Sequence, residues 1–291
     1  RAQEIRSEPT LFAPVPLAPT PGAAGRLLVT EEAARRALAL GFAATAAAQA
    51  ERLVATSEPG EARDAAVLLL TAARLELGDL AGAERALGNH GESRPPRYRV
   101  RAGLIAARRG DLTAAQAELA SLRAEALPEG ERAWYYFLQG LVAEEMRDAG
   151  RAGAAYDQAV AVAVSDWQRA RLRLTRERLR LAEGQATEEQ AGELRRQAER
   201  YAGRRVGTDY AIQHAVALAL LGRRDAAVAY LQEQLANTSE IGVAEAGDDL
   251  RLMVGVIAGP GAAAGRLALE QLLVGGREAA KQRMALALLV R

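Results

Sequence analysis

Apolar residues recur at helical spacing along the chain from Thr30 onward. Residues 136–146 and 151–160 give the clearest example. Each stretch repeats apolar or small side chains three and four positions apart, and a short break at 147–150 separates the two. This spacing puts the apolar side chains on one face of a helix, so the two stretches predict a helical hairpin. The rest of the chain has the same character, and we predict an all-α fold.

Short turns interrupt this pattern at a nearly constant step. They fall at residues 41, 78, 110, 147, 184, 222 and 259, with separations of 37, 32, 37, 37, 38 and 37, and each is marked by Gly or by a residue near Gly. Gly suits these places because a helix ends most easily with a left-handed residue, which costs Gly nothing. A period in the thirties is typical of a helical solenoid, so we predict about seven helix-turn-helix repeats and roughly fifteen helices.

Polar residues indicate where helices begin and where units separate. Thr30, followed by Glu31 and Glu32, predicts a helix N-terminus. The capping box at 187–190 predicts a helix that begins near residue 188. Breaks between units are expected at 57–60, 91–96, 127–130, 164–165, 203–208, 237–242 and 275–276.

The hairpin at residues 136–159 resembles a tetratricopeptide repeat. Tyr136 occupies the large aromatic position and Gly140 the small one, and Ala152, Tyr156 and Ala159 follow along the second helix. Other units match in part, at Ala83, Leu87, Gly103, Ala115, Leu119, Ala227, Leu231, Ala264 and Ala268. The unit at 166–203 keeps almost none of the signature. The resemblance covers residues 31–291 and implies a right-handed α-solenoid whose first helices line a concave, protein-binding surface.

The two ends of the chain differ from the repeats. Residues 1–29 hold five of the ten prolines and show no periodicity, so they predict an extended lead-in or linker before a repeat domain at 30–291. Residues 276–291 look like the first helix of a further unit. They carry apolar residues that a terminal helix ordinarily lacks, which favours a domain truncated at its C-terminus over an unusual cap.

Composition narrows the class of protein. With 49% apolar and 26% charged residues the chain has the profile of a soluble folded protein, and no run of about eighteen apolar residues predicts a transmembrane segment. Basic and acidic residues balance at 38 and 37, which argues against nucleic-acid binding. The use of Arg in place of Lys is typical of a GC-rich bacterial genome. The Pro-rich start, the missing initiator Met and the absence of Cys favour an extracytoplasmic location, the periplasm or cell envelope, with the cytoplasm as the alternative.

Candidate catalytic residues are few. His90 and His214 are the only histidines and neither lies in a metal-binding spacing; we expect His90 in an exposed turn and His214 packed in an apolar helix. The Gly-rich stretch 255–265 lacks the spacing of a phosphate loop, and Pro260 removes one of the backbone donors that such a loop uses. The absence of Cys excludes thiol catalysis and thiolate metal sites. We therefore predict no enzymatic activity, no cofactor and no metal site.

Two groups of side chains suggest where a partner binds. Residues 134–137 are Trp-Tyr-Tyr-Phe, and the resemblance makes Tyr136 structural while Trp134, Phe137 and Leu141 line the concave surface. Arginines on the neighbouring first helices flank this patch. The predicted partner-binding residues are Arg97, Arg101, Trp134, Phe137, Leu141, Arg171 and Arg178. Trp134 and Phe137 should then be more exposed than Tyr136 and Tyr156. The alternatives are that the aromatic residues pack between repeats and that the arginines form a solvated helix face.

Aromatic anchors beside guanidinium groups would suit an acidic or C-terminal carboxylate of a peptide. We therefore predict a protein–protein interaction scaffold or adaptor that binds a partner segment on the concave face. One alternative is a helical module of a larger exported enzyme or cell-envelope assembly whose active domain lies outside this chain. Another is an array that binds nucleic acid, which the near-zero net charge argues against. The sequence does not define the oligomeric state.

Overall fold

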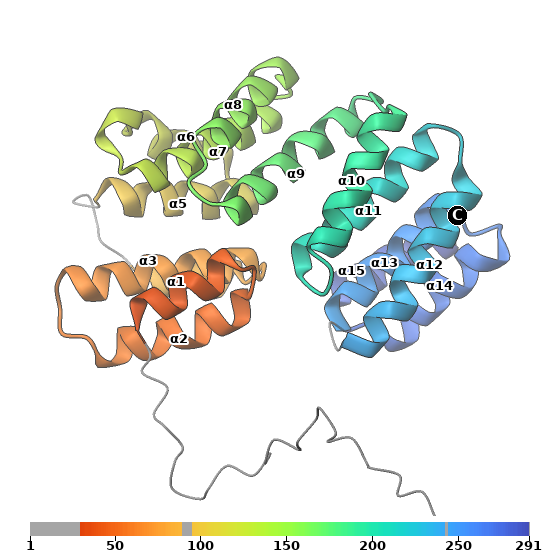
Figure 1. Ribbon diagram of the computed structural model, residues 1–291, viewed down its shortest axis with the longest axis horizontal. Helices are drawn as coiled ribbons and strands as arrows, with labels where there is room; N and C mark the ends of the chain where they lie inside the picture. The colour runs from red at the N-terminus through yellow and green to blue at the C-terminus, as the bar shows by residue number, and fades with distance from the viewer. Residues whose placement is uncertain (1–29, 89–94, 242–243, 291) are drawn as a thin grey trace, which may run out of the picture.

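The computed structural model describes residues 30–88, 95–241 and 244–290, and the side chains among them outside 238–245. Within these residues the chain forms fifteen α-helices, one short 3-10 helix and no strand (Figure 1). The helices are α1 (Glu31–Ala39), α2 (Ala43–Thr56), α3 (Glu61–Glu76), α4 (Leu80–Leu87), α5 (Pro96–Arg109), α6 (Leu112–Ala120), η2 (Ala124–Ala126), α7 (Glu129–Glu145), α8 (Ala149–Ala161), α9 (Asp166–Ala182), α10 (Glu188–Arg200), α11 (Arg205–Leu220), α12 (Arg224–Ile241), α13 (Ala244–Ala258), α14 (Ala263–Gly275) and α15 (Ala279–Leu289). The all-α prediction is confirmed; the predicted lead-in at 1–29 lies outside the described residues.

The helices form two rows. Helices that follow one another in the sequence pack side by side from α1 to α9 and again from α10 to α15. The odd-numbered helices also contact one another, α1 with α3, α3 with α5, α5 with α7, α9 with α11, α11 with α13 and α13 with α15. One row of odd-numbered helices, backed by the even-numbered ones, is an arrangement compatible with an α-solenoid.

The predicted turns lie where the sequence places them. Each of the seven contains a residue with a left-handed backbone, namely Gly41, Gly78, Gly110, Arg147, Gly184, Gly222 and Gly259. Side-chain caps then start the next helices: Asp79, Asp111 and Asp148 accept hydrogen bonds from backbone N–H groups of α4, α6 and α8. Thr30 and Thr187 cap α1 and α10 in the same way, as predicted.

Several predicted breaks extend into a helix: Pro96 belongs to α5, residues 129–130 to α7 and Gly275 to α14, and two breaks are wrong over a longer stretch. Residues 205–208 belong to α11, although a break was expected over 203–208. The reason for glycine at 207 is close packing: a Cβ atom there would lie 2.1 Å from the carbonyl oxygen of Tyr201. Helix α12 likewise continues through residues 237–241. Polar residues lower helix propensity by only a few tenths of a kcal/mol each, so they do not by themselves end a helix.

Small residues allow the helices of a hairpin to approach closely. A Cβ atom on Gly140 of α7 would lie 2.3 Å from the ring of Tyr156 on α8. Gly255 of α13 meets Leu269 of α14 in the same manner, and Gly103 of α5 meets Leu138 of α7 between neighbouring units. Tyr156 is fully buried and donates its hydroxyl hydrogen to Glu144 at 2.7 Å. The small and aromatic positions of the hairpin at 136–159 therefore pack against each other.

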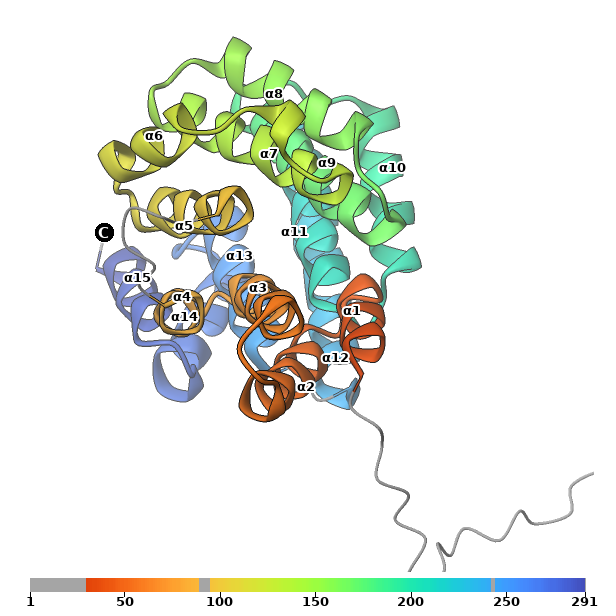
Figure 2. The same cartoon turned by 90° about the vertical axis from the view of Figure 1, so that its left-hand side faces the viewer.

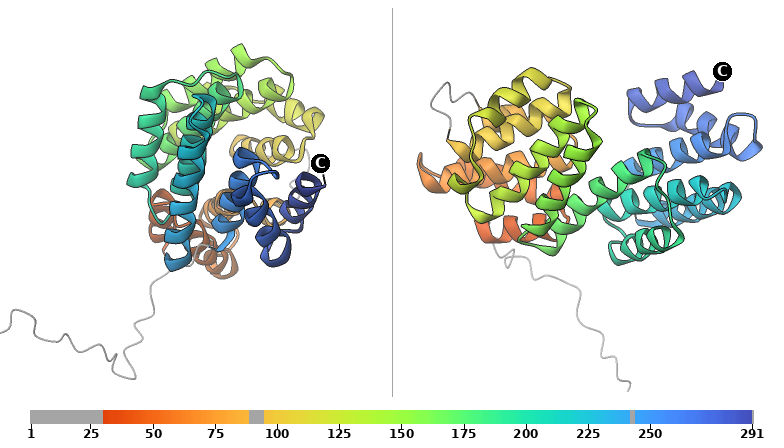
Figure 3. Two further views of the ribbon diagram at one scale, coloured as in Figure 1. Left: turned by 90° about the vertical axis from the view of Figure 1, so that its right-hand side faces the viewer. Right: turned by 90° about the horizontal axis from the view of Figure 1, so that it is seen from above.

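The first nine helices close on themselves. Helix α9 contacts α1, more than a hundred residues earlier in the chain. Trp167, at the start of α9, is buried in a cluster that includes Ala34 and Leu38 of α1 and Leu69 of α3. Figure 2 shows α1, α3, α5, α7 and α9 around a common centre, and Figure 3 shows α10–α15 continuing away from them. We call α1–α9 the closed turn, meaning one complete turn of the helical array rather than a loop between two helices.

The left-handed backbone of Arg147 should lower the stability of the protein. It has φ 60, in the left-handed region that six of the seven turns assign to Gly. Arg147→Gly should raise the free energy of unfolding by about 0.5–1 kcal/mol, because relief of steric strain exceeds the added backbone entropy. Urea denaturation followed by circular dichroism measures this change.

The matched control is Gly110→Ala. Gly110 has φ 78 and no atom within 4 Å of an added Cβ, so backbone strain alone acts there. This substitution should lower the stability by about 1 kcal/mol. If Arg147→Gly destabilises the protein as Gly110→Ala does, the proposed strain at 147 is absent.

Candidate functional site

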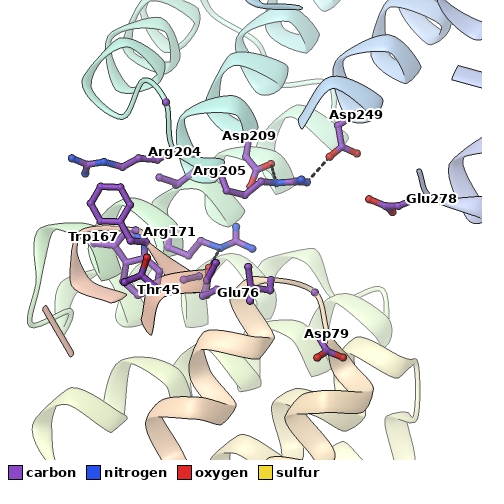
Figure 4. A pocket seen from close by; sticks show the side chains of 18 of the residues that line it. Thr45, Glu76, Asp79, Trp167, Arg171, Arg204, Arg205, Asp209, Asp249 and Glu278 are labelled. Atoms are coloured by element: carbon purple, nitrogen blue, oxygen red, sulfur yellow. Dashed lines mark hydrogen bonds and ion pairs between the residues drawn. The ribbon is translucent and has the colours of Figure 1, made fainter. Parts of the chain in front are cut away.

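A cavity of about 890 Å³ lies where the closed turn meets the following helices. We call it the central cleft. Its walls come from the α1–α2 turn, the end of α3, α5, α9, α11, α13 and the start of α15 (Figure 4). The lining residues include Phe42, Thr45, Glu76, Leu77, Asp79, Arg108, Trp167, Arg171, Arg204, Arg205, Asp209, Asp249, Arg277, Glu278 and Lys281.

Ion pairs organise the walls of the central cleft. Arg171 on α9 reaches Glu76 at the end of α3 at 3.1 Å, which links the last helix of the closed turn to its third. On the opposite wall, Arg205 lies between Asp209 at 3.1 Å and Asp249, as Figure 4 shows. Lys281 of α15 reaches Asp249 at 2.7 Å. The cleft is therefore bounded by two networks, one on each wall.

Burial and charge shift the pKa values of these groups in opposite directions. Burial lowers the pKa of Arg171, but the carboxylates of Glu76 and Asp209 outweigh it, and the net shift is upward. Burial lowers the pKa of Arg108, which Glu76 offsets only in part. The pKa of Asp209 is raised by burial against the opposing effect of Arg205 and Arg171. Arg171 is thus well compensated, whereas Arg108 is not.

A much smaller cavity of about 20 Å³ lies beside the cleft, inside the closed turn. It is lined by Ala72, Leu75, Glu76, Arg101, Leu104, Arg108, Trp134, Phe137 and Trp167. This volume is enough for one water molecule and for nothing larger. The centre of the closed turn is therefore filled by its own side chains.

The structure brings three of the predicted partner-binding residues together at this small cavity. Arg101 is 5% exposed, pairs with Glu131 at 2.9 Å, and lies 5.7 Å from the centre of the Trp134 ring. Phe137 contacts Trp134 edge-on at 5.9 Å and is only 3% exposed.

The expected order of exposure is wrong for Phe137. Tyr136 is half-buried, and Phe137 is more buried than it. Trp134 is half-buried, because Trp167 of α9 lies against it at 6.4 Å. Closure of the turn thus covers the surface that was expected to be an open groove. Phe137 packs between helices, which was the alternative given in the sequence analysis.

The other four predicted residues are dispersed. Arg171 lines the central cleft. Arg178 is exposed on α9 and contacts both carboxylate oxygens of Glu144, at 2.6 and 2.7 Å. Leu141 is partly buried against the main core, and Arg97 is half-buried in the first turn of α5.

Sequence patterns missed most of the cleft. Glu76, Arg108, Arg205, Asp209 and Lys281 belong to four different helices, and apart from the i,i+4 pair Arg205–Asp209 no spacing in the sequence relates them. They meet only because α9 packs against α1 and α3. The one local signal was the Arg204–Arg205 pair beside a turn, which we interpreted as part of a break.

No cluster of three or more His, Cys, Asp or Glu side chains that could hold a metal occurs among the described residues. His214 is buried as expected, with Nδ1 2.8 Å from the carbonyl oxygen of Ala191 and its ring edge-on to Tyr230. His90 lies outside the described residues. No helix in the described part of the chain is long and apolar enough to cross a membrane.

Comparison with known proteins gives no relative. No protein-family model matches the chain, and neither the curated proteins nor the solved structures contain a match.

Arg101 should stabilise the fold mainly through Glu131. The side chains are 6% and 17% exposed, and Arg101 Nε and Nη1 make no hydrogen bond to any described residue. Arg101→Met should lower the free energy of unfolding by about 3 kcal/mol, because it leaves a buried carboxylate unpaired. Adding Glu131→Leu should restore most of that loss.

Chemical denaturation of the single and double variants measures both changes. The control is Arg195→Met, which breaks an exposed pair with Glu199 and should change stability by less than about 1 kcal/mol. A double variant as unstable as Arg101→Met would contradict this account.

Proposed function

We propose that this chain is a protein–protein interaction scaffold rather than an enzyme, and that it holds a segment of a partner protein on its concave face. In this proposal the chain is a right-handed, tetratricopeptide-like α-solenoid of about seven helical hairpins. The recurrence of a left-handed residue at seven turns and the row of odd-numbered helices support it. Such a fold suits binding because each unit uses only part of its surface for packing.

The observation that carries the proposal is the central cleft. Its volume of about 890 Å³ lies in the upper part of the range of ligand sites. Helices from distant parts of the chain form its walls, and ion pairs fix their side chains. Phe42 and Leu77 line it with 49% and 45% of their surface exposed, so apolar anchors stand beside charged groups. That combination is typical of interfaces.

The central cleft replaces the groove that the sequence suggested. Arg101 and Phe137 are buried, and of the predicted residues only Arg171 lines the cleft. The proposed binding surface therefore lies at the end of the closed turn, between α3 and α9 on one side and α11, α13 and α15 on the other.

Site-specific crosslinking tests this proposal. The chain has no cysteine, so Leu77→Cys can carry a single photoreactive group in the cleft. In cells of the source organism this probe should crosslink one defined protein. Combining this probe with Phe42→Ala and Arg204→Glu should abolish the crosslink. The two substitutions remove an aromatic side chain from the cleft lining and replace a positive charge by a negative one.

Val274→Cys provides the control position, since Val274 is 88% exposed and does not line the cleft. Met146→Ala with Arg151→Glu, made in the Leu77→Cys background, matches the cleft substitutions on an exposed surface of α7 and α8. Equal crosslinking from both positions, or no effect of the cleft substitutions, would refute the proposal.

A second candidate is the helical module of a larger exported enzyme or cell-envelope assembly. Exposed apolar side chains on α14 and α15 favour it, namely Leu267, Val274, Met284, Leu286 and, just beyond α15, Val290. A face of this kind ordinarily packs against another element.

Denaturing electrophoresis of the protein from its source cells tests this candidate. It should show a chain larger than the 30.9 kDa of these residues; otherwise co-purification under native conditions should show a stable partner that Leu267→Lys and Met284→Lys release. A chain of this mass that sediments alone would exclude the candidate.

A further inference from the structure

The central cleft holds basic side chains that its own carboxylates do not neutralise. Six basic residues and five acidic residues line it. All five carboxylates are paired: Glu76 with Arg171, Asp209 and Asp249 with Arg205, Glu278 with Lys281, and Asp79 with Arg74 outside the cleft. Three of the six basic residues, Arg108, Arg204 and Arg277, have no carboxylate of a described residue within 4.0 Å.

Neutral partners hold the guanidinium groups of Arg108 and Arg204, and a backbone hydrogen bond fixes the chain at Arg277. Arg108 donates a hydrogen bond from Nη1 to the carbonyl oxygen of Leu75 at 2.7 Å. The guanidinium of Arg204 lies over the rings of Phe42 and Tyr201, at 5.6 and 5.7 Å from their centres. The backbone N–H of Arg277 donates to Asp248 at 2.7 Å. Neutral partners therefore position Arg108 and Arg204 and leave their charge available to an anion.

The unpaired arginines are distributed along the cleft. Arg108 comes from α5, Arg204 from the turn before α11, and Arg277 from the turn before α15. Figure 4 shows Arg204 and Glu278 at opposite ends of the site, with Asp209 and Asp249 between them. Because the three arginines come from three separate elements of the cleft wall, the arrangement suits an extended ligand better than a single small anion.

Resting on the proposed function, we propose that the partner segment is an extended acidic peptide. Its Asp or Glu side chains pair with Arg108, Arg204 and Arg277. Guanidinium groups bind carboxylates with strong, directional hydrogen bonds. Neutral residues of the peptide, between its acidic ones, lie next to the carboxylates of Asp209 and Asp249. An apolar side chain of the peptide packs beside Phe42.

This pattern fits a peptide better than a nucleic acid. A phosphodiester chain carries a charge at every nucleotide, and some of its phosphates would lie against Asp209, Asp249 and Glu278. The net charge of +1 also provides no long-range attraction for a polyanion. A peptide with spaced carboxylates avoids both costs.

Fluorescence anisotropy with the whole chain tests the proposal. The probes are labelled peptides of one length in which Glu, Gln or Lys alternates with Ala and Leu, and a single-stranded RNA. The Glu peptide should bind, and the Gln and Lys peptides should bind at least tenfold more weakly. Arg277→Gln and Arg204→Gln should each weaken the Glu peptide by roughly tenfold, as for loss of one charged hydrogen bond.

Arg283→Gln is the matched control, because it makes the same charge change on exposed α15 outside the cleft lining. It should leave the affinity within about twofold, and added salt should weaken the wild type more than Arg277→Gln. Circular dichroism checks that each variant is folded.

The outcomes separate this inference from the proposed function. Equal binding of the Glu and Gln peptides, lost in the Arg204 variant, overturns the acidic partner and leaves the cleft as a binding site. Tighter binding of RNA than of the Glu peptide overturns the choice of a peptide. Binding that is insensitive to the cleft variants, or no binding, overturns the inference, while crosslinking from Leu77→Cys decides the proposed function independently.

Discussion

The packing of Trp167 against α1 and α3 is the contact on which the interior of this protein depends. A helical repeat array ordinarily joins only neighbouring units. Trp167 instead joins helices more than a hundred residues apart, and its indole is 7% exposed. Burial of a side chain of this size contributes about 4 kcal/mol, several times more than a surface ion pair. Apolar packing therefore closes the turn, and the ion pair between Arg171 and Glu76 fixes its register.

Closure decides which inner surfaces remain available. Inside the turn, Trp134, Phe137 and Arg101 meet Trp167 and leave room for a single water molecule. At the end of the turn, the same closure brings α3 and α9 opposite α11, α13 and α15 and creates the central cleft. The packing of α9 against α1 and α3 therefore determines both the filled interior and the cleft. It is incompatible with a groove along the whole concave face.

Local chemistry made the turns predictable. Left-handed residues and Asp or Thr caps act within four residues, so the spacing of Gly41, Gly78 and Gly110 was sufficient to locate three of the hairpins. The close approach of Gly140 and Tyr156 followed from the resemblance of one unit to a known repeat. Contacts between distant units have no such local signal. We predicted Phe137 on an open surface because no local pattern indicates that Trp167 packs against Trp134, which contacts Phe137.

The unit at 166–203, which departs most from the repeat signature, is the one that closes the turn, and its arginines explain how. On α9, Arg171 reaches Glu76 of α3, Arg176 reaches Asp157 of α8, and Arg178 reaches Glu144 of α7. A run that looked like a solvated face or a peptide clamp is a set of ties to three helices. Because each partly exposed pair contributes less than about 1 kcal/mol, these ties orient α9 rather than hold it. We infer that Trp167 supplies the energy of closure, the arginines set the angle at which α9 crosses the turn, and that angle positions the cleft.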